Sequence, residues 1–193
     1  MNFLKGLGKI KANDRVLIIG ASGALGTYAI QIAKHYGAEV TGVCSSSNLG
    51  LLKILGADDA VDYATTDFTR NGKQYDIIFD TLGKSSFGAC KNSLTKDGVY
   101  LSAVTDVTLF IQMMWTSVTA GKKAKSSATG MLPVKTRLDY LTELKTLLAT
   151  RKIQTIIDHH YPLCMAAEAH TYVETGIDPI FKTHILRSNK IRS

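Results

Sequence analysis

Cysteine and proline are scarce in this chain, and the placement of the cysteines excludes several classes of protein. The 193 residues include three of each, and Cys44, Cys90 and Cys164 lie far apart. No Cys-x-x-Cys or His-x-x-x-His spacing occurs. Such close pairs are typical of zinc sites and disulfide frameworks. The sequence therefore predicts neither a disulfide-stabilised scaffold nor a metal site.

Long apolar runs are also missing. No segment reaches the roughly 20 apolar residues that a membrane-spanning helix needs. Residues 1–5 lack the apolar core of a signal peptide. We therefore expect a cytoplasmic protein with no membrane partner. The hydrophobic fraction of 45% is enough for a folded core, and the length suits one domain with an appendage.

The net charge of +7 raises the question of nucleic-acid binding. The basic residues are spread along the chain, apart from Lys122, Lys123, Lys125 and the C-terminal tail, and no aromatic residues alternate with them. A basic surface also attracts an anionic cofactor. We therefore expect no nucleic-acid partner.

A glycine-rich loop is the most informative feature that is present. Residues 16–19 form an unbroken aliphatic run, typical of a buried parallel strand, and an amphipathic helical pattern continues from the loop to Tyr36. The apolar face of that helix is expected to carry Leu25, Tyr28, Ala29, Ile32, Ala33 and Tyr36, with Gln31, Lys34 and His35 elsewhere. Strand, glycine turn and helix in this order favour dinucleotide binding, although a purely structural turn has the same pattern.

Each glycine of the loop has a separate expected role. Gly20 lets the chain turn sharply after the strand, Gly23 leaves room for a pyrophosphate, and Gly26 lets the helix approach the sheet. The N–H groups of Gly23, Ala24 and Leu25 are then expected to point outward at the positive end of the helix dipole. The loop is thus a candidate pyrophosphate site.

The end of the second predicted strand, residues 40–44, indicates which dinucleotide is bound. An NAD site places Asp or Glu about 20 residues beyond the glycines, whereas residues 40–57 contain no acid. Ser45 and Ser46 follow the strand instead, and their hydroxyls can donate to a 2′-phosphate. We therefore predict NADP(H) rather than NAD(H). The same segment also fits the N-cap of a helix that begins near Leu49, and the two roles are compatible.

Strands and helices alternate through the first two thirds of the chain. This pattern predicts an α/β fold with a doubly wound parallel sheet, a Rossmann fold. In such sheets, ligands bind beyond the carboxyl ends of the strands, where the strand order reverses. Tyr63, Thr81, Leu82 and Ala103 follow predicted strands and are expected to line this crevice. Asp80 is assigned either to the crevice or to a turn.

The last third of the chain has a different pattern. Residues 109–118 predict an apolar helix whose Trp115 is expected in the core, and residues 123–129 are a candidate sixth strand. The alternation stops near residue 153. We therefore expect a dinucleotide-binding domain over residues 1–152 and a C-terminal segment over residues 153–193. Partial exposure is expected for the apolar residues Ile156, Ile157, Leu163 and Ile185 of that segment.

These motifs together resemble the medium-chain dehydrogenase/reductase superfamily, and its zinc-independent quinone oxidoreductase branch is nearest. The resemblance covers nearly the whole chain. It is carried by residues 15–18, 20–26, 31–34, 55–58, 62–63, 79–83, 161–163 and 167–170. One departure is the Phe181-Lys182 pair, where the family usually has Gly-Lys before its final strand.

The resemblance implies roles for individual residues. Ser22, Ala24 and Leu25 match pyrophosphate contacts, and Ser45 and Ser46 match 2′-phosphate contacts. Lys34 and Tyr63 are further candidates beside the 2′-phosphate. Family members also carry an N-terminal GroES-like catalytic domain, and we expect this chain to lack it because it begins just before the first nucleotide-binding strand.

The function that follows is the NADP(H)-binding part of an oxidoreductase acting on a quinone, enone, aldehyde or alcohol. By itself this chain is expected to be inactive, and no catalytic residue is assigned. The alternative is a non-catalytic NADP(H)-binding module or truncated gene product. The resemblance further implies a homodimer through the sheet edge.

Overall fold

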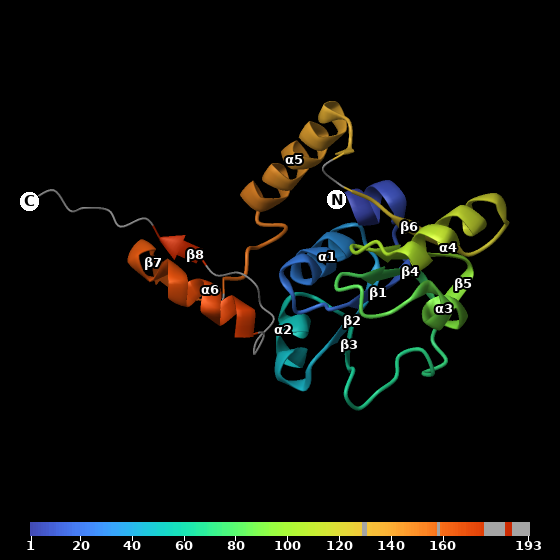
Figure 1. The fold of residues 1–193 in the computed structure, drawn as a ribbon, viewed down its shortest axis with the longest axis horizontal. Coiled ribbons are helices and arrows are strands. Elements are labelled where there is room, and N and C mark those ends of the chain that lie inside the picture. The colour runs from blue at the N-terminus through green and yellow to red at the C-terminus, as the bar shows by residue number, and fades with distance from the viewer. Residues whose placement is uncertain (129–130, 158, 176–183, 187–193) are drawn as a thin grey trace, which may run out of the picture. The chain divides into compact units, whose positions relative to one another are not determined.

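The computed structural model describes residues 1–128, 131–157, 159–175 and 184–186. The chain divides into two compact units, Met1–Gln154 and Thr155–Ser193. The first unit contains the sheet and every predicted cofactor residue (Figure 1). Each unit is described separately below.

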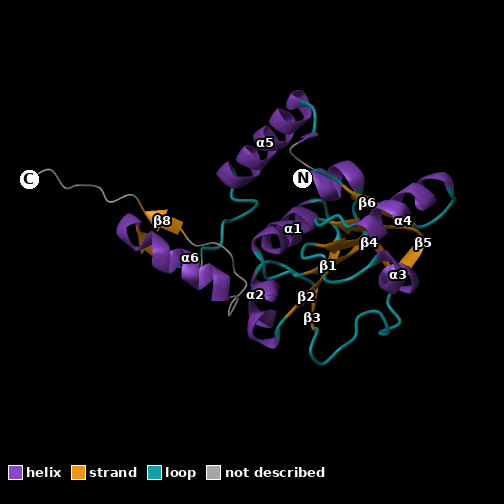
Figure 2. Ribbon diagram, in the orientation of Figure 1, coloured by secondary structure: helices purple, strands orange, loops and turns teal. Residues whose placement is uncertain are grey.

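The first unit is built on a six-stranded sheet in which every pairing is parallel. Its strands are β1 (Arg15–Ile19), β2 (Glu39–Cys44), β3 (Asp59–Asp62), β4 (Tyr75–Asp80), β5 (Leu94–Ser102) and β6 (Lys123–Ser126). The spatial order is β3-β2-β1-β4-β5-β6, as Figure 2 shows. This is the predicted doubly wound Rossmann fold, and its switch point lies between β1 and β4.

Helices between these strands are α1 (Ala24–His35), η2 (Ser46–Asn48), α2 (Leu49–Ile54), α3 (Phe87–Cys90), η3 (Lys91–Ser93) and α4 (Val107–Val118). Two further helices flank the sheet in sequence: η1 (Asn2–Leu7) precedes β1, and α5 (Val134–Ala149) follows β6. The strand order runs outward in opposite directions from the switch point. Right-handed crossovers therefore place α1 and α2 on one face of the sheet, and α3 and α4 on the other.

The core lies on both faces of the strands. Leu17 and Ile78 belong to the buried cluster that also contains Phe87 of α3 and Leu109 of α4. The alternate residues of β1 and β4, such as Ile18 and Ile77, are equally buried. Burial on both faces explains why these strands are continuous apolar runs in the sequence.

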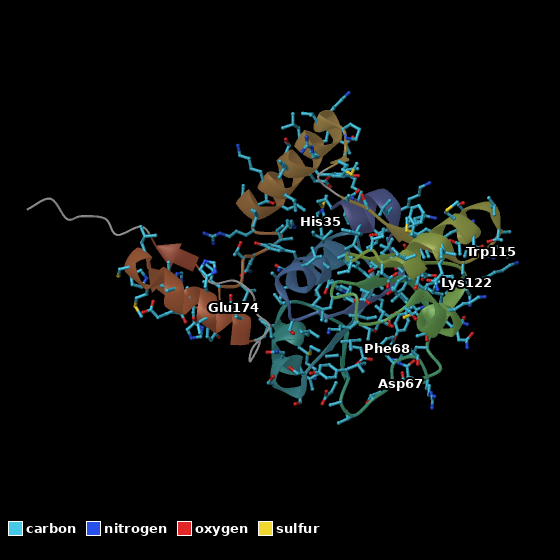
Figure 3. The ribbon with its side chains drawn as sticks, viewed as in Figure 1. His35, Asp67, Phe68, Trp115, Lys122 and Glu174 are labelled. Carbon is cyan, nitrogen blue, oxygen red and sulfur yellow. The ribbon has the colours of Figure 1, made fainter. Side chains whose placement is uncertain are left out.

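The position of Trp115 is a correction to the sequence analysis. Its side chain is 73% exposed on α4 (Figure 3), not part of the core. The helix is apolar on both sides, and Leu109 and Thr116 mark the side that is buried. The opposite side carries a row of exposed apolar residues, the α4 stripe: Val107, Phe110, Ile111, Met114, Trp115 and Val118.

Two residues of α1 also depart from the expected pattern. Gln31, expected away from the apolar face, is buried, whereas Leu25, expected on it, is 44% exposed. The amide of Gln31 compensates its burial through hydrogen bonds with the backbone of Gln154, which follows α5. Nε2 donates to the carbonyl oxygen at 3.0 Å, and Oε1 accepts from the N–H at 2.6 Å. A buried amide with such partners costs little.

The second unit contains β7 (His160–Pro162), η5 (Leu163–Met165), α6 (Ala166–Thr175) and β8 (His184–Leu186), with β7 and β8 paired in parallel. Residues 181–183 of the predicted last strand lie outside the described residues, as does the side chain of Ile185. Ile157 and Leu163 are exposed and Ile156 is half-buried. Across both units, no described helix combines the length and the apolar character that crossing a bilayer would require.

Candidate functional site

The glycine loop closes tightly between β1 and α1. Gly20 has a φ of +74°, which a side chain would strain. The N–H groups of Gly20 and Ala21 both donate to the carbonyl oxygen of Val43 in β2, at 3.1 and 3.0 Å. A Cβ on Gly26 would lie 2.2 Å from the carbonyl oxygen of Gly20. The turn at Gly20 and the close approach at Gly26 are therefore as predicted.

The N-terminus of α1 offers N–H groups at the carboxyl edge of the sheet. Ala24 and Leu25 form its first turn, where the helix itself provides no acceptor. The expectation that the Gly23 N–H points outward was wrong, because this N–H donates to the carbonyl oxygen of Gly20 at 3.1 Å. Gly23 is the N-cap residue and stabilises the turn from within. The candidate anion site thus consists of the Ala24 and Leu25 amides and the positive helix end.

The loop after β4 is fastened to the glycine loop. The Thr81 hydroxyl donates to the carbonyl oxygens of Ile19 and Gly20, at 2.8 and 3.2 Å. Leu82 lies so close to Gly20 that a Cβ there would be 2.6 Å from Leu82 Cγ. The structure therefore brings Thr81 and Leu82 to the glycine loop, as expected for a crevice at the switch point.

Asp80 holds the loop after β4 in place through hydrogen bonds. Its side chain is fully buried, and its two oxygens accept from the N–H groups of Leu82, Gly83 and Ser85 at 2.8–3.0 Å. The Tyr100 hydroxyl donates to the same carboxylate at 3.1 Å. Burial, and then the nearby Asp80 charge, raise the pKa of Tyr100, so the hydroxyl remains a donor.

Ala103 follows β5 at the same edge of the sheet. Its N–H donates to the backbone carbonyl oxygen of Asp80 at 2.9 Å, and the residue is half-buried. The structure therefore ties the chain after β5 to the end of β4. The predicted crevice residues of both strand ends lie side by side.

The predicted serines lie at the end of β2. Ser45 is half-buried and Ser46 is exposed. The Ser45 and Ser47 hydroxyls are 2.9 Å apart, and Asn48 Nδ2 donates to Ser45 Oγ at 3.2 Å. Ser45 and Asn48 occupy N-cap positions, but neither side chain makes a capping hydrogen bond. The capping alternative therefore does not account for these side chains.

The structure adds one residue that the sequence analysis missed. Asp62, the last residue of β3, is the register partner of Cys44 in β2. Its Oδ1 accepts from the N–H of Ala64 at 2.9 Å. Burial, and then the charge of Asp62, raise the pKa of the Cys44 thiol to about 11. The sequence pattern locates an acid only along the chain beyond β2, whereas the acid beside the end of β2 belongs to the neighbouring strand β3.

Tyr63 and Lys34 are placed differently. The Tyr63 N–H donates to the carbonyl oxygen of Cys44 at 3.2 Å, and its side chain is 65% exposed beside the end of β2. Lys34 is in the last turn of α1, and its Nζ lies 2.8 Å from both carboxylate oxygens of Asp58. Asp58 also accepts from the N–H of Val40 at the start of β2. Lys34 is therefore at the amino edge of the sheet, and its expected role beside a 2′-phosphate is not supported.

The remaining predicted contact is Ser22. It lies in the glycine loop between Gly20 and α1 and is 2% exposed. Among the residues that the structure describes, no three His, Cys, Asp or Glu side chains are grouped as ligands for a metal ion.

The fold and the site together define a Rossmann-type domain with a candidate anion-binding loop at its switch point. Residues 55–178 match the family model described as zinc-binding dehydrogenase. The chain belongs to this family, within the medium-chain dehydrogenase/reductase superfamily.

Individual relatives are consistent with this assignment. The chain is 34% identical over 179 residues to the mitochondrial NAD(P)H oxidoreductase RTN4IP1 of Mus musculus, covering 84% of this chain and 45% of that protein. It is 34% identical over 172 residues to the chloroplast envelope quinone oxidoreductase homolog of Arabidopsis thaliana, covering 86% of this chain and 50% of that protein. The chain thus spans about half the length of the curated relatives it matches.

A solved structure shows the same fold. The quinone oxidoreductase of Escherichia coli, solved in complex with NADPH, aligns with a TM-score of 0.76 at 23% identity. The alignment covers 97% of this chain and 61% of that chain.

Proposed function

We propose that this chain binds NADP(H) and forms the cofactor-binding part of an oxidoreductase that transfers a hydride between NADP(H) and a quinone, enone, aldehyde or alcohol. The observation that carries the proposal is the meeting of the glycine loop and the serine-rich end of β2 at one sheet edge. The Val43 carbonyl oxygen, which accepts from Gly20 and Ala21, joins the two directly.

The residues at this edge fit a dinucleotide. The Ala24 and Leu25 amides face the place of a pyrophosphate, because they lie in the first turn of α1. Thr81, Leu82 and Ala103 lie on the β4 and β5 side of the switch point, where the nicotinamide half would rest. When bound, the cofactor supplies the hydride, and these residues hold and orient it.

The adenosine end is where NADP(H) and NAD(H) differ. Ser45 and Ser46 offer hydroxyl donors to a 2′-phosphate. Asp62 opposes binding of a 2′-phosphate, because its carboxylate lies at the end of the adjacent strand and repels a phosphate. Its hydrogen bond to the Ala64 N–H turns one oxygen into the following loop. We assign the preference to NADP(H) because the hydroxyls follow β2 itself, where an NAD site has its acid.

Catalysis needs more than this edge supplies. Asp80 is the buried carboxylate nearest the crevice, and three N–H groups and one hydroxyl already donate to it. Holding a substrate against the cofactor contributes roughly 7 to 11 kcal/mol to catalysis. That contribution requires a substrate pocket, which we assign to further residues of the kind that the longer relatives contain. A non-catalytic NADP(H)-binding module is the second candidate, because Asp80 is committed to its loop.

Titration calorimetry tests the cofactor proposal. We expect NADPH to bind at least about tenfold more tightly than NADH, because hydrogen bonds to a charged phosphate contribute about 1.5 to 3 kcal/mol. Equal affinities, or tighter binding of NADH, would contradict it. Oxidation of NADPH by this chain with quinones, enones and aldehydes is expected to stay at background, and rapid saturable turnover would place a catalytic group within the chain.

We further propose a homodimer through the edge of the sheet. Within the described sheet, β6 pairs on one side with β5, so its other side is an open sheet edge, where the Ala124 N–H donates to the Thr116 hydroxyl of α4 at 3.1 Å. The α4 stripe lies next to that edge, because α4 packs against β6. Large exposed apolar rows of this kind mark interaction surfaces. Analytical ultracentrifugation is expected to show a dimer that Trp115→Glu converts to monomer, whereas a monomeric parent would contradict the proposal.

A further inference from the structure

A cavity of about 500 Å³ lies between α1 and α5, and Leu25 and Phe79 line it near the carboxyl end of the sheet. Ligand pockets in proteins span about 300 to 1,000 Å³, so the size suits a small molecule. The walls come from four elements of the first unit: η1, α1, β4 and α5. Phe3 and Phe79 stack in it with their ring centroids 5.0 Å apart.

Polar contacts hold the two walls in place beside the cavity. Lys5 Nζ of η1 lies 2.6 Å from Glu143 Oε2 of α5, and the Tyr36 hydroxyl at the end of α1 donates to the other Glu143 oxygen. After α5, the Gln31 amide is bonded to both backbone groups of Gln154. These bonds fasten α5 and the segment after it to η1 and α1 on either side of the cavity. The gap between them is therefore part of the fold.

The walls of the cavity are apolar but are not covered. Leu141 and Leu148 of α5 line it, yet they remain 61% and 43% exposed. Apolar surface left in water costs about 25 cal/mol per Å² relative to burial. An apolar ligand that displaces this water is therefore favoured. No other described element covers these leucines.

The charge of the lining is one-sided. Lys145 of α5 is the single charged side chain in the described lining, and no carboxylate of that lining neutralises it. An ammonium beside an apolar cavity complements a ligand that has an apolar body and an anionic end. A neutral ligand would leave the ammonium without an anionic partner, and the ammonium would repel a cationic ligand.

We propose that this cavity binds a long-chain carboxylate, with the hydrocarbon chain between α1 and α5 and the carboxylate at Lys145. The proposal does not depend on nicotinamide binding, because Thr81, Leu82 and Ala103, the residues assigned to the nicotinamide half, do not line the cavity. Leu25 is the one residue that both lines the cavity and belongs to the candidate pyrophosphate loop.

The test is titration calorimetry with laurate below its micelle concentration, compared with dodecanol, which has the same chain and no charge. We expect saturable binding of laurate with one site per chain and weaker binding of dodecanol. Leu144→Trp fills the cavity from α5 and is expected to weaken laurate binding by more than about tenfold, because the apolar contact area is lost. Lys145→Gln is expected to bring laurate and dodecanol to equal affinity.

Leu138→Trp is the matched control. Leu138 is on the same helix, is 57% exposed and does not line the cavity, so this variant should bind laurate as the parent does. Circular dichroism and thermal unfolding check that each variant is folded. Unchanged laurate binding in folded Leu144→Trp would overturn the proposal, as would equal losses in Leu138→Trp and Leu144→Trp. An absence of laurate binding would overturn it too. In that case, a second copy of the chain or a closer α5 would fill the cavity.

Discussion

The two ends of the sheet are built from the same strands but differ in how their charged groups are paired. At the amino end, Asp58 pairs with Lys34 and Asp59 pairs with Lys73, at 2.8 and 2.7 Å. Asp76 accepts from the N–H of Arg15 and from the Thr95 hydroxyl. At the carboxyl end, the carboxylates of Asp62 and Asp80 accept from loop N–H groups. The same end also carries serine and threonine hydroxyls, the first-turn amides of α1 and the positive end of its dipole. Lysines thus neutralise two of the carboxylates at the amino end, whereas the carboxyl end is the candidate site for an anion.

This difference explains why the carboxyl end, and not the amino end, is the candidate site. A parallel sheet with helices in right-handed crossovers directs helix N-termini toward the carboxyl ends of the strands and helix C-termini toward the amino ends. Lysines are stabilised near helix C-termini, which is where Lys34 is found. Four substitutions, three of them with a companion substitution, test this comparison.

Gly26→Ala is expected to have the largest effect. The new Cβ would lie 2.2 Å from the Gly20 carbonyl oxygen and 2.6 Å from the Ala21 Cα, both of which are backbone atoms. We expect the free energy of unfolding to fall by about 3 kcal/mol and NADPH binding to be lost, because α1 must move away from the loop. Chemical denaturation and calorimetry measure both.

Gly50→Ala is the control for that substitution. Gly50 lies in α2, and a Cβ there would meet nothing within 4 Å. Alanine should therefore stabilise the protein by about 0.5 to 1 kcal/mol through helix propensity. If Gly26→Ala is equally well tolerated, the close packing at the loop is not what shapes the site.

Asp80→Asn is expected to rank second. The amide replaces one acceptor oxygen with an NH₂ group that faces N–H donors, so the free energy of unfolding should fall by about 2 to 3 kcal/mol. Asp76→Asn makes the same change at the amino end, where the carboxylate is half-buried and has two partners. We expect about 1 kcal/mol there. Equal losses in denaturation experiments would remove the distinction between the two ends.

Ser45→Asp tests the charge of the carboxyl end. A carboxylate after β2 would repel a 2′-phosphate and accept from ribose hydroxyls, so we expect the calorimetric preference to reverse in favour of NADH. The change should amount to about 1.5 to 3 kcal/mol. Asp62→Asn should act in the opposite direction and tighten NADPH binding, because it removes the neighbouring carboxylate. An unchanged NADPH to NADH ratio in both variants would place the phosphate elsewhere.

Lys73→Gln at the amino end is expected to have the smallest effect. The hydrogen bond from Lys73 lowers the pKa of Asp59 and the same bond raises the pKa of Lys73. The pair therefore stabilises the fold between about pH 5 and pH 10, and its contribution is lost as the pH falls through the lowered Asp59 pKa or rises through the raised Lys73 pKa.

Because both side chains of that pair are about half exposed, we expect a loss below about 1 kcal/mol at neutral pH. Denaturation curves of parent and variant should converge as the pH falls below the lowered pKa of Asp59, where this carboxyl is protonated in both. NADPH affinity should not change. A weaker NADPH complex would show that the amino end also contributes to the site.

The sequence predicted the sheet and the loop because both depend on patterns among residues that are close together in the chain. The run at residues 16–19 and the spacing of Gly20 and Gly26 needed no knowledge of distant residues. Trp115 was misplaced because α4 is apolar on both sides, and periodicity cannot tell which side packs on the sheet. Asp62 was missed because its position beside Cys44 depends on strand register. The pairing of Lys34 with Asp58 likewise depends on contact between residues that are far apart in the chain.

The bond between Gln31 and Gln154 has a consequence for how the chain is made. The two residues are separated by 123 positions, so during synthesis α1 emerges long before its buried amide can find its partner. Until then, Gln31 Nε2 has the Thr27 carbonyl oxygen of its own helix as an acceptor, at 3.0 Å, but Oε1 lacks the Gln154 N–H. The first unit is therefore expected to become fully protected against hydrogen exchange along α1 only after Gln154 has left the ribosome. Chains that stop at Thr150 should show α1 as the first helix to exchange.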